Sequence, residues 1–201
     1  TGITPEGIPG FAPDLCEYCS YDPEQAQTLY DEWVAEGGVQ DGPLPIQFNA
    51  DAGHEPVVQI VIDNLAAIGI QAEAQPFPSE TYFTEIADGD CVFCRTGWFA
   101  DYPTYDNFMY DLYHQDSLGG NNHGYISDEL DALVAEATET VDTDEQAALF
   151  QEAEDILLNQ DIGAVPINWY RGDYAYNADR IANFPQTNFG LILWEQITLA
   201  A

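Results

Sequence analysis

Residues 91–103 read Cys-Val-Phe-Cys-Arg-Thr-Gly-Trp-Phe-Ala-Asp-Tyr-Pro, and no other stretch says as much about this chain. The short apolar run at its start predicts a strand over 91–98. That strand would deliver one cation, one large aromatic side chain and one carboxylate to a single loop: Arg95, Trp98 and Asp101. Such a set suits a ligand with both an ammonium group and a carboxylate, because each ligand charge then meets its opposite.

Helices and strands alternate on the N-terminal side of this stretch. Asp22 and Pro23 are typical of a helix start, and helical spacing of apolar residues continues to Val34. Further elements are expected as a strand at 44–50, a helix at 55–68, a strand at 70–76 and a short helix after Ser79. This alternation predicts an α/β lobe with a partly parallel sheet.

The second half of the chain is expected to be more helical. A short aromatic helix is predicted over 103–114, and Ser127 begins a second helix. Thr143 and Gln146 have the spacing of a capping box at the start of a third. Strands are expected at 164–170 and 190–199.

The charge balance of the chain is extreme. Its 201 residues hold 36 Asp and Glu against three cations, Arg95, Arg171 and Arg180, for a formal net charge of −33. This argues against nucleic acid and anionic membranes as partners, since phosphate binding needs clustered Lys and Arg. We interpret the acidic residues as a solubilising surface whose self-repulsion salt would screen, rather than as a specific cation site.

The length and the N-terminus suggest a single lobe cut from a longer precursor. A length of 201 residues fits one domain or lobe with a sizeable core. We find no apolar run of about 18 residues and no basic-then-apolar leader, so neither a transmembrane helix nor a signal peptide is expected within these residues. The chain also lacks a starting Met.

Four cysteines form two Cys-x-x-Cys pairs, Cys16 with Cys19 and Cys91 with Cys94. Disulfides are the favoured interpretation, with structural zinc and free thiols as alternatives. In a strand, the Cα atoms of Cys91 and Cys94 would lie about 10 Å apart. A disulfide needs less than about 7 Å. This favours cross-pairing between the two motifs, unless a turn or bulge breaks the strand.

The chain resembles the family 5 extracellular solute-binding proteins, the peptide receptors of ABC importers. The resemblance rests on weak pieces whose order matches over about 170 residues. They are residues 8–10, 21–26, His54, 64–70, 81–82, 97–103, 107–108, 121–122, Tyr125, 130–133, 153–157 and 165–166.

This resemblance implies a periplasmic-binding-protein-like (type II) C-terminal lobe, with a mixed sheet flanked by helices. Residues 1–179 would form the ligand-binding lobe, and 180–201 would return toward an N-terminal lobe of the same protein. In the isolated chain, Leu191, Ile192, Leu193 and Trp194 are expected to be partly exposed. The implied role is extracytoplasmic capture of peptides between two lobes for an ABC permease, by a periplasmic protein or cell-surface lipoprotein, without catalysis or cofactor.

The resemblance also implies five ligand-binding residues, each with a structural alternative. Asp101 matches the carboxylate for a ligand amine, or it caps the following helix. Trp98 matches a pocket aromatic, or it belongs to the core. Arg95 would meet a ligand carboxylate, or form a structural ion pair. Phe99 would contact the peptide through its backbone, or pack, and His54 would approach longer peptides, or cap a helix.

Other functions compete with this one. The same receptor could take a non-peptide ligand such as a sugar or a metal chelate. A secreted acidic hydrolase with paired carboxylates is a different class, but no nucleophile, zinc or phosphate-loop motif supports it. A zinc-stapled interaction domain is a third. Neither His114 nor His123 has metal-ligand spacing, so neither is assigned a role.

Overall fold

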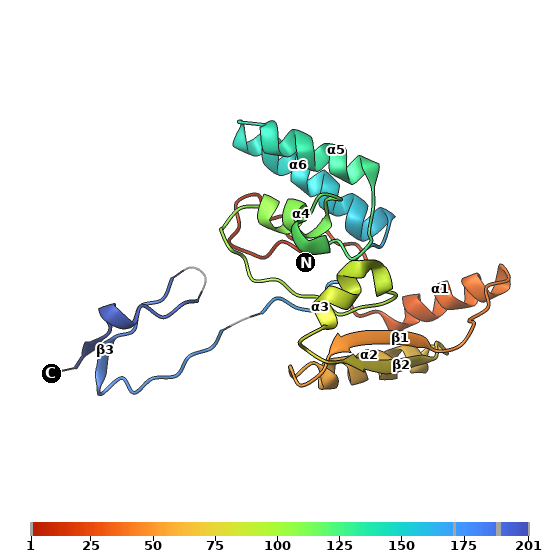
Figure 1. Ribbon diagram of the computed structural model, residues 1–201, viewed down its shortest axis with the longest axis horizontal. Coiled ribbons are helices and arrows are strands. Elements are labelled where there is room, and N and C mark those ends of the chain that lie inside the picture. Colours follow the sequence, from red (N-terminus) through yellow and green to blue (C-terminus); the bar gives the residue numbers. More distant parts are fainter. Residues whose placement is uncertain (1, 171, 188–189, 201) are drawn as a thin grey trace. The chain divides into compact units, whose positions relative to one another are not determined.

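The computed structural model describes residues 2–170, 172–187 and 190–200, and the chain forms two compact units, residues 1–166 and 167–201 (Figure 1). The first unit begins with the predicted alternation of helices and strands. Its first four elements are α1 (Pro23–Ala35), β1 (Leu44–Asn49), α2 (Glu55–Ala67) and β2 (Ala72–Phe77). Strands β1 and β2 pair in parallel, with Leu44 opposite Ala72, which confirms the partly parallel sheet.

Local signals in the sequence explain where these elements begin. The Asp22 carboxylate accepts a hydrogen bond from the Gln25 N–H at 2.9 Å, as a helix N-cap does, and Pro23 occupies the first turn. Helix α2 packs on the small sheet and buries Val58 against Ile46 and Phe48. These residues form a small hydrophobic core that is distinct from the larger, helical core described next.

The rest of the first unit is helical. It contains α3 (Tyr82–Glu85), α4 (Asp106–Tyr113), α5 (Asp128–Glu139) and α6 (Thr143–Asp155), with π-helical turns over Ile86–Asp90 and Ile156–Gln160 and a 3₁₀ turn over Leu118–Gly120. Helices α5 and α6 pack side by side (Figure 1). The main core is centred on Met109, Leu130, Val134, Phe150 and Leu157, all nearly inaccessible to solvent. The predicted helix over 103–114 is shorter than expected.

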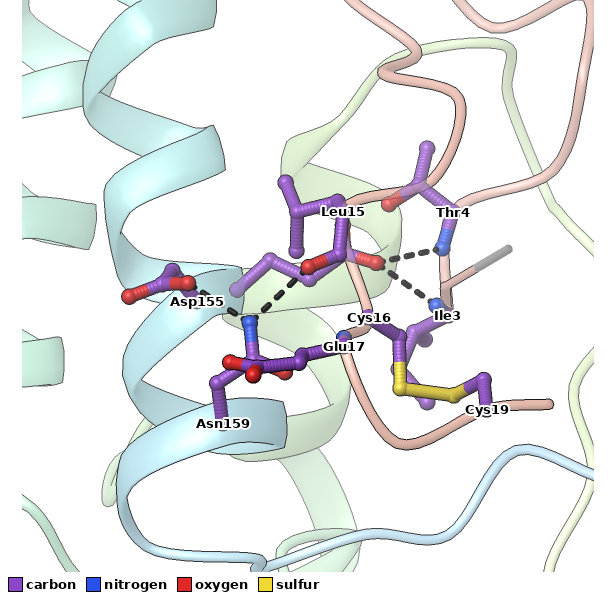
Figure 2. Close-up of a disulfide and its surroundings, with 9 residues drawn as sticks. Ile3, Thr4, Leu15, Cys16, Glu17, Cys19, Asp155 and Asn159 are labelled. Atoms are coloured by element: carbon purple, nitrogen blue, oxygen red, sulfur yellow. Dashed lines mark hydrogen bonds between the residues drawn. A yellow bond between two sulfur atoms is a disulfide. The ribbon is translucent and has the colours of Figure 1, made fainter. Parts of the chain in front are cut away.

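Two polar side chains of the α6 region bind the N-terminal segment (Figure 2). Buried Glu154 accepts hydrogen bonds from the N–H groups of Ile3 (2.6 Å) and Thr4 (3.3 Å). Asn159 donates to the Leu15 carbonyl and accepts from the Glu17 N–H, both at 2.8 Å. The segment around the Cys16–Cys19 disulfide is thereby tied to the helical core.

The disulfide interpretation is confirmed, but the favoured cross-pairing is wrong. Cys16 bonds Cys19 and Cys91 bonds Cys94, with Cα–Cα distances of 5.4 and 5.5 Å. The Cys91–Cys94 distance is short because 91–94 is a turn rather than a strand. All four thiols are consumed, so the zinc and free-thiol interpretations are wrong as well.

The strand predicted over 91–98 is also wrong, since only Cys94 makes a β-bridge there, with Gln47. Two predicted caps are wrong too. Asp142, not Thr143, caps α6. The Gln146 side chain donates to the carbonyls of Ala137, near the end of α5, and of Thr140. Ser79 Oγ donates to the Ala50 carbonyl instead of capping a helix. Ser127 does cap α5, through the Leu130 N–H.

The second unit, residues 167–201, is a short antiparallel hairpin with extended flanks. Strands β3 (Ile181–Asn183) and β4 (Thr198–Leu199) pair, and a 3₁₀ turn spans Trp194–Gln196. In the described part of 164–170 there is no regular strand, and the strand expected over 190–199 shrinks to β4 and one bridge at Ile192. Leu191 and Trp194 are 64% and 70% exposed, which confirms the expected exposure for these two residues. Arg171 lies outside the described residues.

Within the described ranges, no helix combines the length and the apolar character needed to cross a membrane.

Candidate ligand-binding loop

The loop that carries four of the five predicted site residues is built onto β1 by Gln47. The Gln47 N–H donates to the Phe93 carbonyl at 2.9 Å, and its carbonyl accepts from the Arg95 N–H at 2.8 Å. Its side-chain oxygen accepts from the Val92 N–H at 2.8 Å. One buried residue thus satisfies three polar backbone groups of the turn, which would otherwise need a neighbouring strand.

Tyr82 adds a second tie between the loop and β1. Its side chain is fully buried, and its hydroxyl group lies 2.9 Å from the Gln47 carbonyl and 2.8 Å from the Arg95 carbonyl. Burial raises the pKa of Tyr82 to about 12, although the backbone hydrogen bond and the nearby Arg95 charge act in the opposite direction. The hydroxyl group therefore stays a neutral donor at physiological pH.

Asn107, in the first turn of α4, holds the other end of the loop. It is fully buried, and its Oδ1 accepts from the Trp98 indole N–H at 3.1 Å and from the Asp101 main-chain N–H at 2.9 Å. Its Nδ2 donates to Asp111 Oδ2 at 2.7 Å. Trp98 is half-buried and packs beside the helical core. Its indole N–H is committed within the protein, so the ring face is what remains to meet a ligand.

The Asp101 carboxylate is exposed, and within the described residues it makes no hydrogen bond or ion pair. The helix-cap alternative for Asp101 is wrong, because α4 begins at Asp106 after Tyr105, with no side-chain cap. An exposed carboxylate without a partner, on a loop held by its own backbone, can accept a charge-assisted hydrogen bond from a ligand ammonium group.

Arg95 and His54 lie close enough to interact electrostatically. Burial, and then the Arg95 charge, lower the pKa of His54, while Glu55 acts in the opposite direction. His54 precedes α2 without making a side-chain cap bond, so the capping alternative is wrong. Arg95 is half-buried and already makes contacts within the chain. The structure thus brings His54 to the Arg95 end of the loop.

Phe99 is 75% exposed. It lies between Trp98 and Asp101 in sequence, so a large apolar surface adjoins the free carboxylate. At this exposure Phe99 is not part of a buried core.

Three residues of this region were not predicted as site residues: Gln47, Asn107 and His123. Gln47 lies between Ile46 and Phe48, where strand alternation predicts a solvent-facing side chain, yet it is buried under the 91–95 turn. Asn107 preceded the apolar pair Phe108 and Met109, which was a signal for a buried polar residue. No signal in the sequence pointed to His123.

His123 contacts the loop from the segment before α5. Its Nε2 lies 3.3 Å from Thr96 Oγ1, and its Nδ1 is buried with no partner in the described part of the chain. Its φ of 49° is left-handed, which is uncommon for a non-glycine residue. Burial lowers the pKa of His123, so the ring is neutral at physiological pH. His114, by contrast, stacks on Tyr110 and lies 3.9 Å from Asp131, within the fold.

An apolar hollow of about 500 Å³ lies elsewhere in the first unit. It is lined by α1 and the ends of the small sheet, through Ala26, Leu29, Tyr30, Trp33, Gln40, Leu44 and Ile70. None of the predicted site residues lines it, so the hollow and the loop are separate features. Among the described residues there is no group of three or more His, Cys, Asp or Glu that could hold a metal ion.

Comparison with known proteins places the chain in a family. Residues 1–120 match the family of bacterial extracellular solute-binding proteins, family 5 Middle. Heme-binding protein A of Haemophilus influenzae is 26% identical over 182 residues, which is 85% of this chain and 31% of that protein. Di/tripeptide-binding protein 1 of Pseudomonas aeruginosa is 26% identical over 188 residues, 89% of this chain and 34% of that protein. The chain spans about a third of the length of these relatives.

Solved structures agree on the fold. The periplasmic binding protein DppA from Helicobacter pylori, in complex with the peptide STSA, aligns with a TM-score of 0.70 and 25% identity over 83% of this chain and 32% of that one. HbpA2 from Haemophilus parasuis aligns over the whole chain and 40% of its own, with a TM-score of 0.74 and 21% identity. The architecture is thus the predicted α/β, periplasmic-binding-protein-like fold. On the match over residues 1–120, this chain belongs to the family 5 bacterial extracellular solute-binding proteins.

Proposed function

We propose that this chain is part of an extracytoplasmic receptor that captures peptides between two lobes and presents them to the permease of an ABC importer. Residues 1–179 form the ligand-binding lobe in this proposal, and 180–201 return toward an N-terminal lobe. Relatives named for binding peptides support the ligand class. Binding is non-covalent, so the receptor performs no reaction on its ligand.

The observation that carries the proposal is the exposed, unpaired carboxylate of Asp101. It lies three residues from Trp98, on a loop whose backbone is tied to Gln47, Tyr82 and Asn107. A fixed carboxylate suits the α-ammonium group of a peptide, because a preorganised site loses little entropy when the ligand binds. The Trp98 and Phe99 rings would contact the peptide beside its amine.

Arg95 and His54 are assigned to the opposite, carboxylate end of the ligand. A guanidinium group can hold a carboxylate through two parallel hydrogen bonds. His54 lies within electrostatic range of Arg95, so both could reach the far end of a peptide. In a chain of net charge −33, the guanidinium group of Arg95 is one of the few positive charges able to attract an anion.

Titration of a two-lobed receptor with trialanine and N-acetyl-trialanine tests the assignment of Asp101. Asp101→Asn should weaken trialanine binding roughly 10–100-fold, since hydrogen bonds to charged groups contribute about 1.5–3 kcal/mol. Acetylation removes the ammonium group, so wild type and Asp101→Asn should bind N-acetyl-trialanine equally weakly. Asp116→Asn removes an equal charge from an exposed site outside the loop and should change neither affinity.

A non-peptide ligand is the second candidate within the same role. One relative is named for heme and another, in Escherichia coli, as a probable deoxycholate-binding protein, so the fold accepts several ligand classes. Native mass spectrometry of the receptor, purified without refolding, separates the two cases. A ladder of masses that fits short peptides supports the peptide proposal, whereas a single mass without an amine refutes the role of Asp101.

A further inference from the structure

Asn107 connects the two residues on which the proposed peptide site depends. It belongs to α4 and is fully buried. Its Oδ1 accepts from the indole N–H of Trp98 (3.1 Å) and from the main-chain N–H of Asp101 (2.9 Å). A single oxygen atom therefore ties together two positions that are three residues apart on an otherwise irregular loop.

The orientation of this amide follows from its partners. The indole N–H and the main-chain N–H are donors only, so both must face Oδ1. On the other side, Asp111 Oδ2 lies 2.7 Å from Nδ2 and requires a donor. Aspartate would lack that donor, and leucine would lack both kinds of group.

Asp111 is itself held, which fixes the far side of the Asn107 amide. The Tyr102 hydroxyl group donates to Asp111 Oδ2 at 2.9 Å, and Asn121 donates to the Asp111 carbonyl at 3.0 Å. Connected hydrogen bonds of this kind restrict one another, because moving one group breaks several bonds. The position of the Asn107 amide is therefore fixed by the groups around it, and the amide in turn fixes the positions of Trp98 and Asp101.

We propose that Asn107 is a positioning residue that holds Trp98 and Asp101 in one geometry for the ligand, an inference that rests on the proposed peptide-binding function. It binds the loop through the main-chain N–H of Asp101, which leaves the carboxylate free for the ligand amine. It also engages the Trp98 indole N–H, so the ligand meets only the ring face. The site thus selects an ammonium group beside an apolar side chain, and it offers no hydrogen-bond donor from Trp98.

Three variants separate the parts of this role. Asn107→Leu removes both the acceptor and the donor, and it leaves the partly buried indole N–H without its protein partner. Asn107→Asp keeps the acceptor but places two carboxylates within hydrogen-bond distance. The double variant Asn107→Asp/Asp111→Asn restores a donor from the other side of the pair, so it should rescue the defect of Asn107→Asp.

Asn159→Leu is the matched control. Asn159 also makes three side-chain hydrogen bonds, but with Leu15 and Glu17 of the N-terminal segment and with Asp155 of α6. Its replacement should lower the melting temperature by an amount similar to Asn107→Leu, and it should leave the loop unchanged. Any effect shared by both variants is then an effect on stability alone.

The first readout is the indole N–H resonance of Trp98 in this 201-residue chain, assigned with Trp98→Phe. We expect Asn107→Leu to move this resonance to the position of a water-exposed indole. The main-chain amide of Asp101 should exchange at least about tenfold faster, because the loss of one hydrogen bond changes an equilibrium by about that factor. Asn107→Asp should shift the resonance, and the double variant should return it toward the wild-type position. An unmoved resonance in Asn107→Leu, or an equal shift in Asn159→Leu, would overturn the proposal.

The second readout is trialanine affinity in the two-lobed receptor. Asn107→Leu should weaken it roughly tenfold or more, and Asn159→Leu should leave it unchanged. Unchanged affinity in Asn107→Leu, despite a shifted resonance, would also overturn the proposal. Failure of the wild-type receptor to bind trialanine would instead refute the peptide function, and the resonance alone would then decide whether Asn107 holds the loop.

Discussion

Replacing Tyr82 with phenylalanine measures how firmly the candidate loop is tied to β1. The hydroxyl group of this fully buried side chain lies 2.9 Å from the Gln47 carbonyl and 2.8 Å from the Arg95 carbonyl. The Gln47 carbonyl also accepts from the Arg95 N–H, so it keeps a donor in the variant. The Arg95 carbonyl, which is partly buried, loses this donor.

The expected loss of stability follows from this difference between the Gln47 and Arg95 carbonyl groups. A wholly or partly buried acceptor that loses its donor costs about 1–3 kcal/mol, so Tyr82→Phe should lower the free energy of unfolding by an amount within that range. For a chain of this size the melting temperature should fall by roughly 2–12 °C. Tyr113→Phe is the matched control: Tyr113 is also buried, but no hydrogen bond of its hydroxyl group is found in the described part of the chain. That variant should cost less than about 1 kcal/mol.

The pH dependence of the unfolding free energy is a second measurement of the same contact. The pKa of Tyr82 is about 12 in the folded chain because of burial, against about 10 when unfolded. The stability that this group contributes is therefore fully present below pH 10 and is lost as the pH rises through about 12. Tyr82→Phe removes this loss. The difference in free energy of unfolding between wild type and variant should therefore narrow as the pH rises from 10 through about 12. Urea unfolding at several pH values measures it, and equal costs for Tyr82→Phe and Tyr113→Phe at neutral pH would refute the reasoning.

Three further predictions concern stability. Glu154 also accepts from the Tyr105 hydroxyl group at 2.7 Å. Glu154→Gln should cost about 1 kcal/mol, because the amide oxygen can still accept from the two main-chain N–H groups and the amide nitrogen can donate to the Tyr105 hydroxyl oxygen. Glu154→Ala should cost about 3 kcal/mol or more, and equal losses in urea unfolding would contradict this. Cys91→Ser and Cys16→Ser open loops of equal length and should each cost about 2 kcal/mol, but only Cys91→Ser should speed amide exchange at Arg95. Raising KCl from about 0.1 to about 1 M should increase the free energy of unfolding, since the Debye length falls from about 10 to about 3 Å around a chain of net charge −33; a flat response would refute the self-repulsion argument.

Elements with a local cause were predictable from the sequence. Asp22 and Ser127 cap helices because their short side chains reach N–H groups three residues on. The parallel pairing of β1 with β2 follows from two apolar runs joined by a helix, which is a connection that antiparallel strands do not need. In each case a few consecutive residues hold all the required information.

The strand expected at 91–98 failed because a strand depends on partners outside itself. Its apolar residues fitted a buried strand, but the backbone groups there bind the main chain and the side chain of Gln47, forty-five or so residues earlier. Once 91–94 is a turn, the Cα atoms of Cys91 and Cys94 come within 5.5 Å, and pairing inside the motif follows. One wrong element thus produced the wrong disulfide pairing.

The predicted site residues came from a motif, whereas their geometry depends on residues outside it. Gln47, Tyr82 and Asn107 are buried polar residues that bind main-chain atoms, the Trp98 indole and, for Asn107, the Asp111 carboxylate. No periodicity in the sequence indicates such contacts. A motif can indicate which side chains meet a ligand. It does not indicate which of their polar groups the protein has already used.

That distinction decides the chemistry available at the loop. The indole N–H of Trp98 and the main-chain N–H of Asp101 both bind Asn107, so neither is available to a ligand. The Asp101 carboxylate makes no such bond within the described residues and faces solvent. A ligand that approaches this loop therefore finds an acceptor with a negative charge and an aromatic face, but no donor from these two residues. Neutral ligands that need a donor there should bind less well than amines, whichever ligand class the receptor carries.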